Sequence, residues 1–280
     1  MKRGMRKSFW KKMESVLCIC VMLFGALELT GCGNTSQTSA DASQESGDDQ
    51  SGIADDVAAG EVTWTLDYDG TLTISGKGAM YEGYSPWMDD EKIKRVVIEN
   101  GITSIGVGAF NQCRNLTSIE IPDSVTEIGG GAFSYCSNLT SIDIPDSVTE
   151  IGDLAFCFCE SLTSIEIPNR VTKIGGNTFE GCVSLTSVTI SNSLTEITDR
   201  AFVNCESLTE VTIPDSVTEI GFAAFDDCRN LTSIEIPDSV TEIGSYAFSN
   251  CRNLTITGYP GTTAETYAQE NEINFVSLDQ

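Results

Sequence analysis

Histidine is absent from this chain of 280 residues, and its absence removes several kinds of chemistry. Imidazole is the commonest general base and metal ligand, and it activates the serine or cysteine of many hydrolases. The chain also lacks a Walker phosphate loop, a Gly-x-Gly-x-x-Gly motif, an EF-hand loop and a Gly-x-Ser-x-Gly elbow. We therefore expect no enzyme, no metal site and no cofactor.

Basic residues are scarce, with 16 Lys and Arg against 41 Asp and Glu, for a net charge of −25. Six of the basic and only two of the acidic residues lie before residue 32. The remainder, 10 basic and 39 acidic, carries a net charge of about −29. A net negative charge of this size repels nucleic acid and anionic membrane surfaces. It indicates a very soluble chain, with a preference for cationic partners as the alternative.

Long hydrophobic runs are also rare, and the one near the start has a specific context. A basic segment at residues 2–12 precedes an apolar run from Val16 to Leu27, which is too short to span a bilayer comfortably. The run ends at Leu29-Thr30-Gly31-Cys32, which resembles the bacterial lipobox, whose Cys becomes the acylated N-terminus. We expect a signal peptide at 1–31, lipidation of Cys32 and an exported protein, lipid-anchored at the outer face of the bacterial membrane or cell surface. An uncleaved signal anchor is the alternative.

Residues 32–60 are rich in Ser, Thr, Gln, Asp, Ala and Gly and contain no aromatic side chain. A segment of this composition cannot bury enough apolar surface to offset its ordering entropy. We interpret it as a disordered tether.

An internal repeat occupies most of the remaining chain. Around each of seven evenly spaced cysteines the pattern Leu-x-x-Ile-x-Ile-Pro-x-x-Val-x-x-Ile-Gly-x-x-Ala-Phe-x-x-Cys recurs with few substitutions, and the copies cover residues 93–253. One copy has too few apolar positions to close a core, so stacking of neighbours must bury them. These cysteines stand 23 residues apart: Cys113, Cys136, Cys159, Cys182, Cys205, Cys228 and Cys251.

Alternation in Ser118-Ile119-Glu120-Ile121 has the period of a half-buried strand. Seven such strands in parallel, about 4.8 Å apart, predict a sheet along one side of the stack. Pro122 ends the strand, and Gly129 permits the next turn. The stacked cysteines predict buried free thiols that act as small apolar side chains, with disulfides as the alternative in an exported protein.

The repeat resembles the BspA-like leucine-rich repeats of bacterial surface proteins. That resemblance implies a solenoid with a parallel β-sheet on one face and short or helical turns on the other. Its flanks resemble the caps of the family: a β-hairpin with an Asp69-Gly70 turn at 61–92, and a helix and strand at 254–280. The resemblance also implies adhesion or protein–protein contact.

The polar positions of the strands are the candidate binding surface. Stacked carboxylates there repel one another unless a cation or a basic partner intervenes. A second acidic row, from Glu127 to Glu242, is interrupted by Lys173, which we expect to relieve the repulsion between Glu150 and Glu196. The candidate residues are Ser118, Glu120, Ser141, Asp143, Ser164, Glu166, Ser187, Thr189, Glu210, Thr212, Ser233 and Glu235.

Three functions remain open on the sequence. The first is a membrane-anchored scaffold that binds a protein partner. That partner comes from a host or from the cell's own surface, and a basic partner is one form of this hypothesis. The second is a carbohydrate or cell-wall binding module, which usually needs exposed aromatic side chains that the strands lack. A glycosidase-like carboxylate pair is the third, and identical stacked repeats offer no environment that would separate the pKa values of two carboxyl groups.

Overall fold

The computed structural model describes residues 50–53, 62–80 and 85–278, which lie in the compact unit Gly47–Gln280. The expected signal peptide, the lipidation site Cys32 and most of the expected tether fall outside the described residues. Within those three ranges, no helix has the length and apolar character needed to cross a bilayer.

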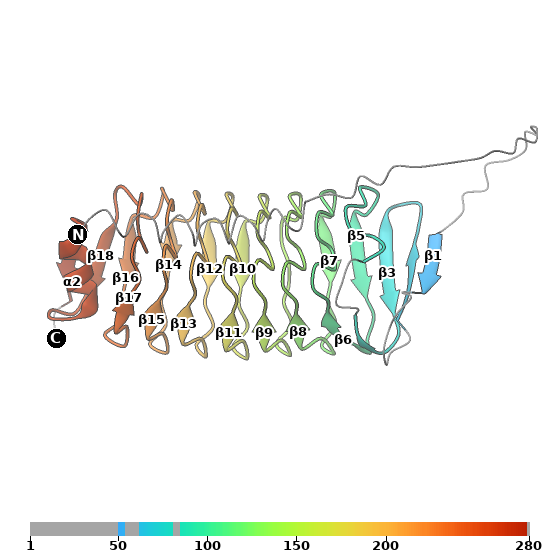
Figure 1. The fold of residues 1–280 in the computed structure, drawn as a ribbon, viewed down its shortest axis with the longest axis horizontal. Coiled ribbons are helices and arrows are strands. Elements are labelled where there is room, and N and C mark those ends of the chain that lie inside the picture. Colours follow the sequence, from blue (N-terminus) through green and yellow to red (C-terminus); the bar gives the residue numbers. More distant parts are fainter. Residues whose placement is uncertain (1–49, 54–61, 81–84, 279–280) are drawn as a thin grey trace, which may run out of the picture. The chain divides into compact units, whose positions relative to one another are not determined.

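The unit Gly47–Gln280 is a parallel β-solenoid in which each turn of the chain stacks on the one before it (Figure 1). The repeat strands have a buried centre and exposed flanks, as the alternation predicts. Partners in neighbouring turns lie 23 residues apart, as in the pairing of Ile165 with Val188, and 22 apart between β16 and β18. These strands are β5 (Arg95–Ile98), β7 (Ser118–Glu120), β10 (Ser164–Glu166), β12 (Ser187–Thr189), β14 (Glu210–Val211), β16 (Ser233–Glu235) and β18 (Thr255–Gly258).

One expected strand does not form. Residues 141–143 pair with neither neighbouring turn, so one sheet ends at β7 and the next begins at β10. The ladder is interrupted again after β14, where a single bridge joins Thr212 to Glu235. The predicted seven-stranded sheet is therefore divided into shorter segments.

A second series of short parallel strands runs along the stack, and the sequence analysis missed it. Most contribute a pair such as Glu127-Ile128, with the Ile buried and the preceding side chain turned outward. Two β-branched residues close to a polar one are a weak strand signal, which the nearby proline and glycine obscured. The series comprises β6 (Ile102–Ile105), β8 (Glu127–Ile128), β9 (Glu150–Ile151), β11 (Lys173–Ile174), β13 (Glu196–Ile197), β15 (Glu219–Ile220) and β17 (Glu242–Ile243), with β4 (Gly78–Ala79) beside β6.

A column of stacked phenylalanines fills the side of the core near the turns. The rings from Phe110 to Phe248 follow one another at centroid distances of 5.2–5.5 Å. Trp87 continues the column at one end and Tyr267 closes it at the other. Trp87 lies 23 residues before Phe110, so the turn of an additional, degenerate repeat precedes residue 93.

The turns beside this column are held by hydrogen bonds between neighbouring repeats. In each turn from Gly108 to Asp227, three N–H groups donate to carbonyls of the following turn over 2.7–3.1 Å, as Phe133 does to Ala155. Two positions per turn adopt left-handed backbone conformations, which Gly131 and Tyr135 illustrate. The turns are therefore tight loops with one conformation repeated along the stack.

Gly129 has a different role from the one we expected. Its φ angle is not positive; instead, a Cβ at this position would lie 2.7 Å from the main-chain nitrogen of Val107 in the preceding turn. The glycine thus permits the close approach of two turns, and its N–H donates to the carbonyl of Ile105. Equivalent bonds form from Gly152, Gly175, Gly221 and Gly244.

Thr198 stands where the other turns have this glycine, and the second ladder is broken there. β11 and β13 do not pair, and neither the Thr195 nor the Thr198 N–H makes the bond that its equivalents make in the described repeats. The Thr198 hydroxyl donates instead to the carbonyl of Gly175 over 2.7 Å. Because a side chain occupies the space that glycine leaves empty, we attribute the break to this residue.

Additional elements flank the repeats at both ends. β2 (Thr63–Leu66) and β3 (Thr71–Ser75) form an antiparallel hairpin, and β3 pairs in parallel with β5. At the other end, α2 (Thr263–Glu270) packs beside β18, and β19 (Asn274–Ser277) pairs with β18 in parallel. That both segments serve as caps remains a prediction.

β1 (Gln50–Ile53) pairs antiparallel with β2, although we expected these residues in the tether. An open strand edge can pair with an extended segment through main-chain groups alone. The side-chain composition of residues 50–53 therefore did not reveal that this segment pairs with β2. The sheet therefore extends beyond the boundary that we predicted at residue 60.

Candidate partner-binding surface

The twelve predicted positions form one exposed surface, which we call the strand lane. All twelve side chains are exposed, whereas the Ile or Val between each pair is buried. Alternation along the strand turns one set outward, and the 23-residue register aligns that set from turn to turn. The structure thus brings together all the residues that the sequence singled out, including Ser141 and Asp143, whose backbone is not a strand.

The charge of the strand lane is uneven. Glu120 forms an ion pair with Arg95 of the preceding turn, so an internal cation already compensates its charge. Asp143 and Glu166 have no ion-pair partner among the described residues. Thr189 then interrupts the acidic row. The expected repulsion is consequently confined to the neighbours Asp143 and Glu166.

A hollow of about 440 Å³ opens at this uncompensated pair. Its lining includes Asp143, Asp146 and Glu166, together with the apolar residues Ile144 and Pro168. The hollow coincides with the missing strand at 141–143. No group of three or more acidic or cysteine side chains in the described ranges is arranged to hold a metal ion. An organic cation, such as a lysine or arginine side chain, matches this lining better because it presents both charge and methylene groups.

Asp146 and Pro168 are members of this surface that the sequence analysis missed. They lie in the segments Ile144-Pro145-Asp146 and Ile167-Pro168-Asn169, which we interpreted only as strand ends. The signal was present, since a proline turn directly after a short strand carries the next side chain back beside it.

The second acidic row behaves differently from the expectation. Lys173 lies beside Glu150, with its Nζ 3.6 Å from the carboxylate, but the ladder to Glu196 is broken. Lys173 therefore compensates Glu150 alone. Farther along, partial desolvation and the nearby charges of Glu196, Glu242 and Asp199 raise the pKa of Glu219.

The cysteine column is buried and contains free thiols. Each thiol donates to the carbonyl of the aromatic residue 26 positions earlier, over 3.1–3.4 Å. Burial raises the pKa of Cys113 and of Cys251 to about 12, and it raises the pKa of the five thiols between them well above the ordinary value. These thiols are packing groups rather than nucleophiles.

Comparison with solved structures returns bacterial leucine-rich repeat proteins. A leucine-rich repeat protein of T. pallidum is 27% identical and has a TM-score of 0.49; the match covers 60% of this chain and 86% of that one. A leucine-rich repeat protein from Bacteroides ovatus is 25% identical, with a TM-score of 0.48 and coverage of 80% and 76%. A leucine-rich cell surface protein from Faecalibacterium prausnitzii is 21% identical, with a TM-score of 0.44 and coverage of 82% and 100%.

Comparison with curated proteins gives no match. The family described as BspA type leucine rich repeat region matches in six copies, over residues 85–209 and 196–274. These ranges contain the whole strand lane and both ladders. The chain therefore belongs to the BspA-type leucine-rich repeat family.

Proposed function

We propose that this protein is a lipid-anchored scaffold of the bacterial surface that binds a basic segment of a protein partner through its strand lane. Membership of the leucine-rich repeat family supports a protein-binding scaffold, and a repeat solenoid is a non-enzymatic scaffold type. The observation that carries the proposal is the exposed hollow at Asp143 and Glu166, where two neighbouring carboxylates lack an internal cation.

The chemistry of the lane specifies the partner. Asp143, Asp146 and Glu166 provide anionic groups around a partly apolar floor, which fits the methylene stem and charged end of Lys or Arg. Glu120 contributes less, because Arg95 already compensates it. The lane carries no aromatic side chain, so nothing on it favours the carbohydrate alternative.

The test is capture of envelope and host-matrix proteins by the full chain, compared with the double variant D143S/E166S. We expect the double variant to bind the captured partner about 10-fold more weakly, the effect of losing about 1.4 kcal/mol of charge-assisted contact. Binding of the parent should weaken as salt is raised, because exposed charges are screened.

A matched control is E196Q/E219Q, which removes two carboxylates from the second acidic row instead. Equal loss in both double variants would show that net charge alone acts, and it would contradict a site on the strand lane. Unchanged binding by D143S/E166S would exclude the hollow.

The anchor is tested separately at Cys32. The parent, expressed in a bacterium fed a radiolabelled fatty acid, should incorporate label and fractionate with membranes, because the Cys sulfur carries the lipid. C32S should lose both properties, whereas C20S, within the apolar run, should keep them. Label retained in C32S would remove the anchor from the proposal.

A further inference from the structure

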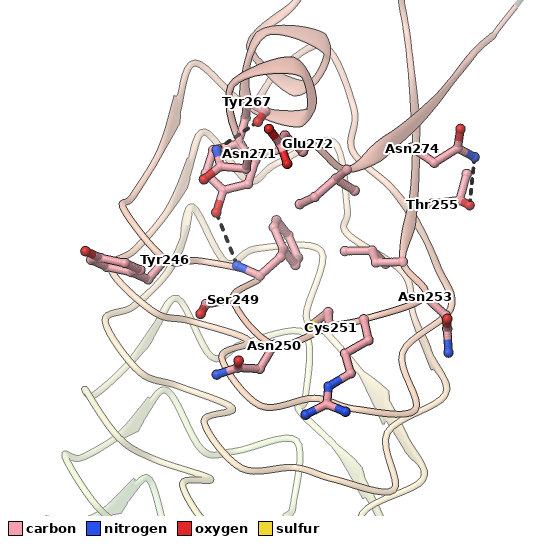
Figure 2. A pocket seen from close by; sticks show the side chains of 14 residues that line it. Tyr246, Ser249, Asn250, Cys251, Asn253, Thr255, Tyr267, Asn271, Glu272 and Asn274 are labelled. Atoms are coloured by element: carbon pink, nitrogen blue, oxygen red, sulfur yellow. Dashed lines mark hydrogen bonds between the residues drawn. The ribbon is translucent and has the colours of Figure 1, made fainter.

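The last repeat ends in a hollow of about 650 Å³ beneath the C-terminal helix (Figure 2). It lies where α2 and β19, rather than another repeat, come after the last described turn. α2 and β19 pack beside β18, and Tyr267 follows the last phenylalanine of the column, but together they leave space beside the last turn. This volume falls within the range of small-molecule sites, roughly 300–1,000 Å³. The hollow is distinct from the strand-lane site at Asp143 and Glu166.

The series of hydrogen bonds that joins successive turns ends at this hollow. In each earlier repeat the N–H equivalent to that of Asn250 donates to the next turn; Asn204 donates to Asp226 over 2.9 Å and Asp227 to Ser249 over 3.0 Å. Asn250 has no acceptor for its N–H among the described residues. At the neighbouring position Tyr267 supplies a substitute, since its hydroxyl accepts from the N–H of Phe248 over 3.3 Å.

Arg252 is the second donor without a protein acceptor. At the equivalent position one repeat earlier, Arg229 forms ion pairs with Glu206 and Asp227. The residues that would provide these carboxylates for Arg252 are Arg229 and Asn250, so Arg252 has no ion pair within the described part of the chain. An exposed guanidinium is thus held at the wall of the hollow.

The opposite wall provides acceptors. Figure 2 shows Asn271 and Glu272 on the helix side, across from Asn250 and Asn253 on the repeat side. The Asn271 side-chain NH₂ donates to the carbonyl of Tyr267, which leaves its amide oxygen available as an acceptor. Phe248, Leu254 and Ile273 form the apolar part of the lining, and Tyr246, with 54% of its surface exposed, stands at the edge.

From this arrangement we propose that the hollow binds a neutral saccharide. Glu272 and the strongly acidic chain disfavour an anion, and Arg252 disfavours a cation. Sugar hydroxyls donate and accept at once, so they can pair with the open N–H groups and with the carboxylate in the same pose. The C–H face of a sugar ring packs against an aromatic side chain such as Tyr246.

The test uses the full chain, labelled with ¹⁵N and kept in a sugar-free zwitterionic detergent. Neutral trisaccharides of glucose, mannose, xylose and N-acetylglucosamine are titrated to about 10 mM, high enough to detect a site with a Kd of about 1 mM. The expected result is a saturable shift of the Asn250 amide signal with at least one trisaccharide. The Asn204 amide, which is bonded to the next repeat, should not move.

R252A should weaken this binding about 10-fold, as expected when a charge-assisted hydrogen bond is lost. R229A, the same change one repeat earlier, should leave it unaltered, and thermal unfolding should show that both variants fold. The proposal is overturned if no trisaccharide shifts Asn250. It is equally overturned if R252A binds as tightly as the parent, or if D143S/E166S abolishes the shift.

Discussion

At the residue scale, the cysteine column is the feature whose behaviour follows most directly from its surroundings. Seven thiols are buried in the core, and each donates to the main-chain carbonyl of an aromatic residue. Ionisation would place a charge where no water and no cation can compensate it, so the folded protein keeps these thiols protonated. The unfolded chain has no such restriction.

This difference predicts instability in alkali. The raised pKa of each folded thiol means that its contribution to stability is complete well below pH 9.0, the ordinary thiol pKa that the unfolded chain keeps, and declines as the pH rises above it. Once the pH exceeds that value by about one unit, each thiol should lower the free energy of unfolding by about 1.4 kcal/mol per further pH unit, and seven by up to about 10 kcal/mol. Urea unfolding between pH 8 and 11 measures the slope.

A pair of substitutions checks that the thiols are the cause. The double variant C159A/C182A should reduce the slope by about 3 kcal/mol per pH unit, as two of the seven titrating groups are gone. A slope that stays the same would assign the alkaline instability to other groups.

At the scale of the elements, the glycine before each turn decides whether neighbouring strands of the second ladder can pair. Gly152 and Gly175 admit the preceding turn to within contact distance of their Cα atoms, whereas Thr198 does not. The second ladder therefore lacks strand pairing between β11 and β13.

We expect T198G to allow β11 and β13 to pair. Two main-chain hydrogen bonds can form, offset by the entropy of an added glycine and by loss of the bond from Thr198 to Gly175, so the net gain is about 1 kcal/mol. The reverse change, G152T, should cost about 2 kcal/mol or more, because the side chain meets main-chain atoms. Chemical denaturation measures both, and destabilisation by T198G would refute this explanation of the break.

The sequence predicted the strand lane well and the second ladder not at all. Alternation at Ser118-Ile119-Glu120 fixes which side chains face outward, because each strand is buried on one side only. In contrast, the pairing of Glu127 with Glu150 depends on how closely two turns approach. That approach depends on the absence of a Cβ at Gly129, and we had assigned this glycine to a turn. The hollows at Asp143 and beside Asn250 also escaped prediction, since each marks a place where the regular stacking stops.

At the scale of the whole repeat unit, stability is shared between neighbouring turns only. Phe179 packs between Phe156 and Phe202, so its ring belongs to two interfaces near the middle of the column. Loss of this ring should weaken the coupling between the two halves of the stack more than it weakens either half.

F179A is therefore expected to cost about 3–5 kcal/mol and to separate two unfolding transitions that coincide in the parent. Trp64 and Trp87, the tryptophans beyond the expected signal peptide, lie in the N-terminal part, so their fluorescence reports that half. Far-ultraviolet circular dichroism reports the entire stack. Phe110 packs next to Trp87, so in F110A the fluorescence midpoint should come before the circular-dichroism midpoint. Coincident transitions in F179A would mean that the solenoid unfolds as one unit.

The near-identity of the repeats has a consequence for how the chain finds its structure. Any turn could stack on the turn after next and leave one repeat looped out, and most of the contacts would be the same. Folding therefore needs marks that distinguish one register from another. Unique neighbours supply them: the stacked rings of Tyr135 and Phe158, with Gly181 leaving room beside Phe158, fit together only when three consecutive turns are in order. These departures from the consensus therefore favour the native order of the repeats over a register that is shifted by one repeat.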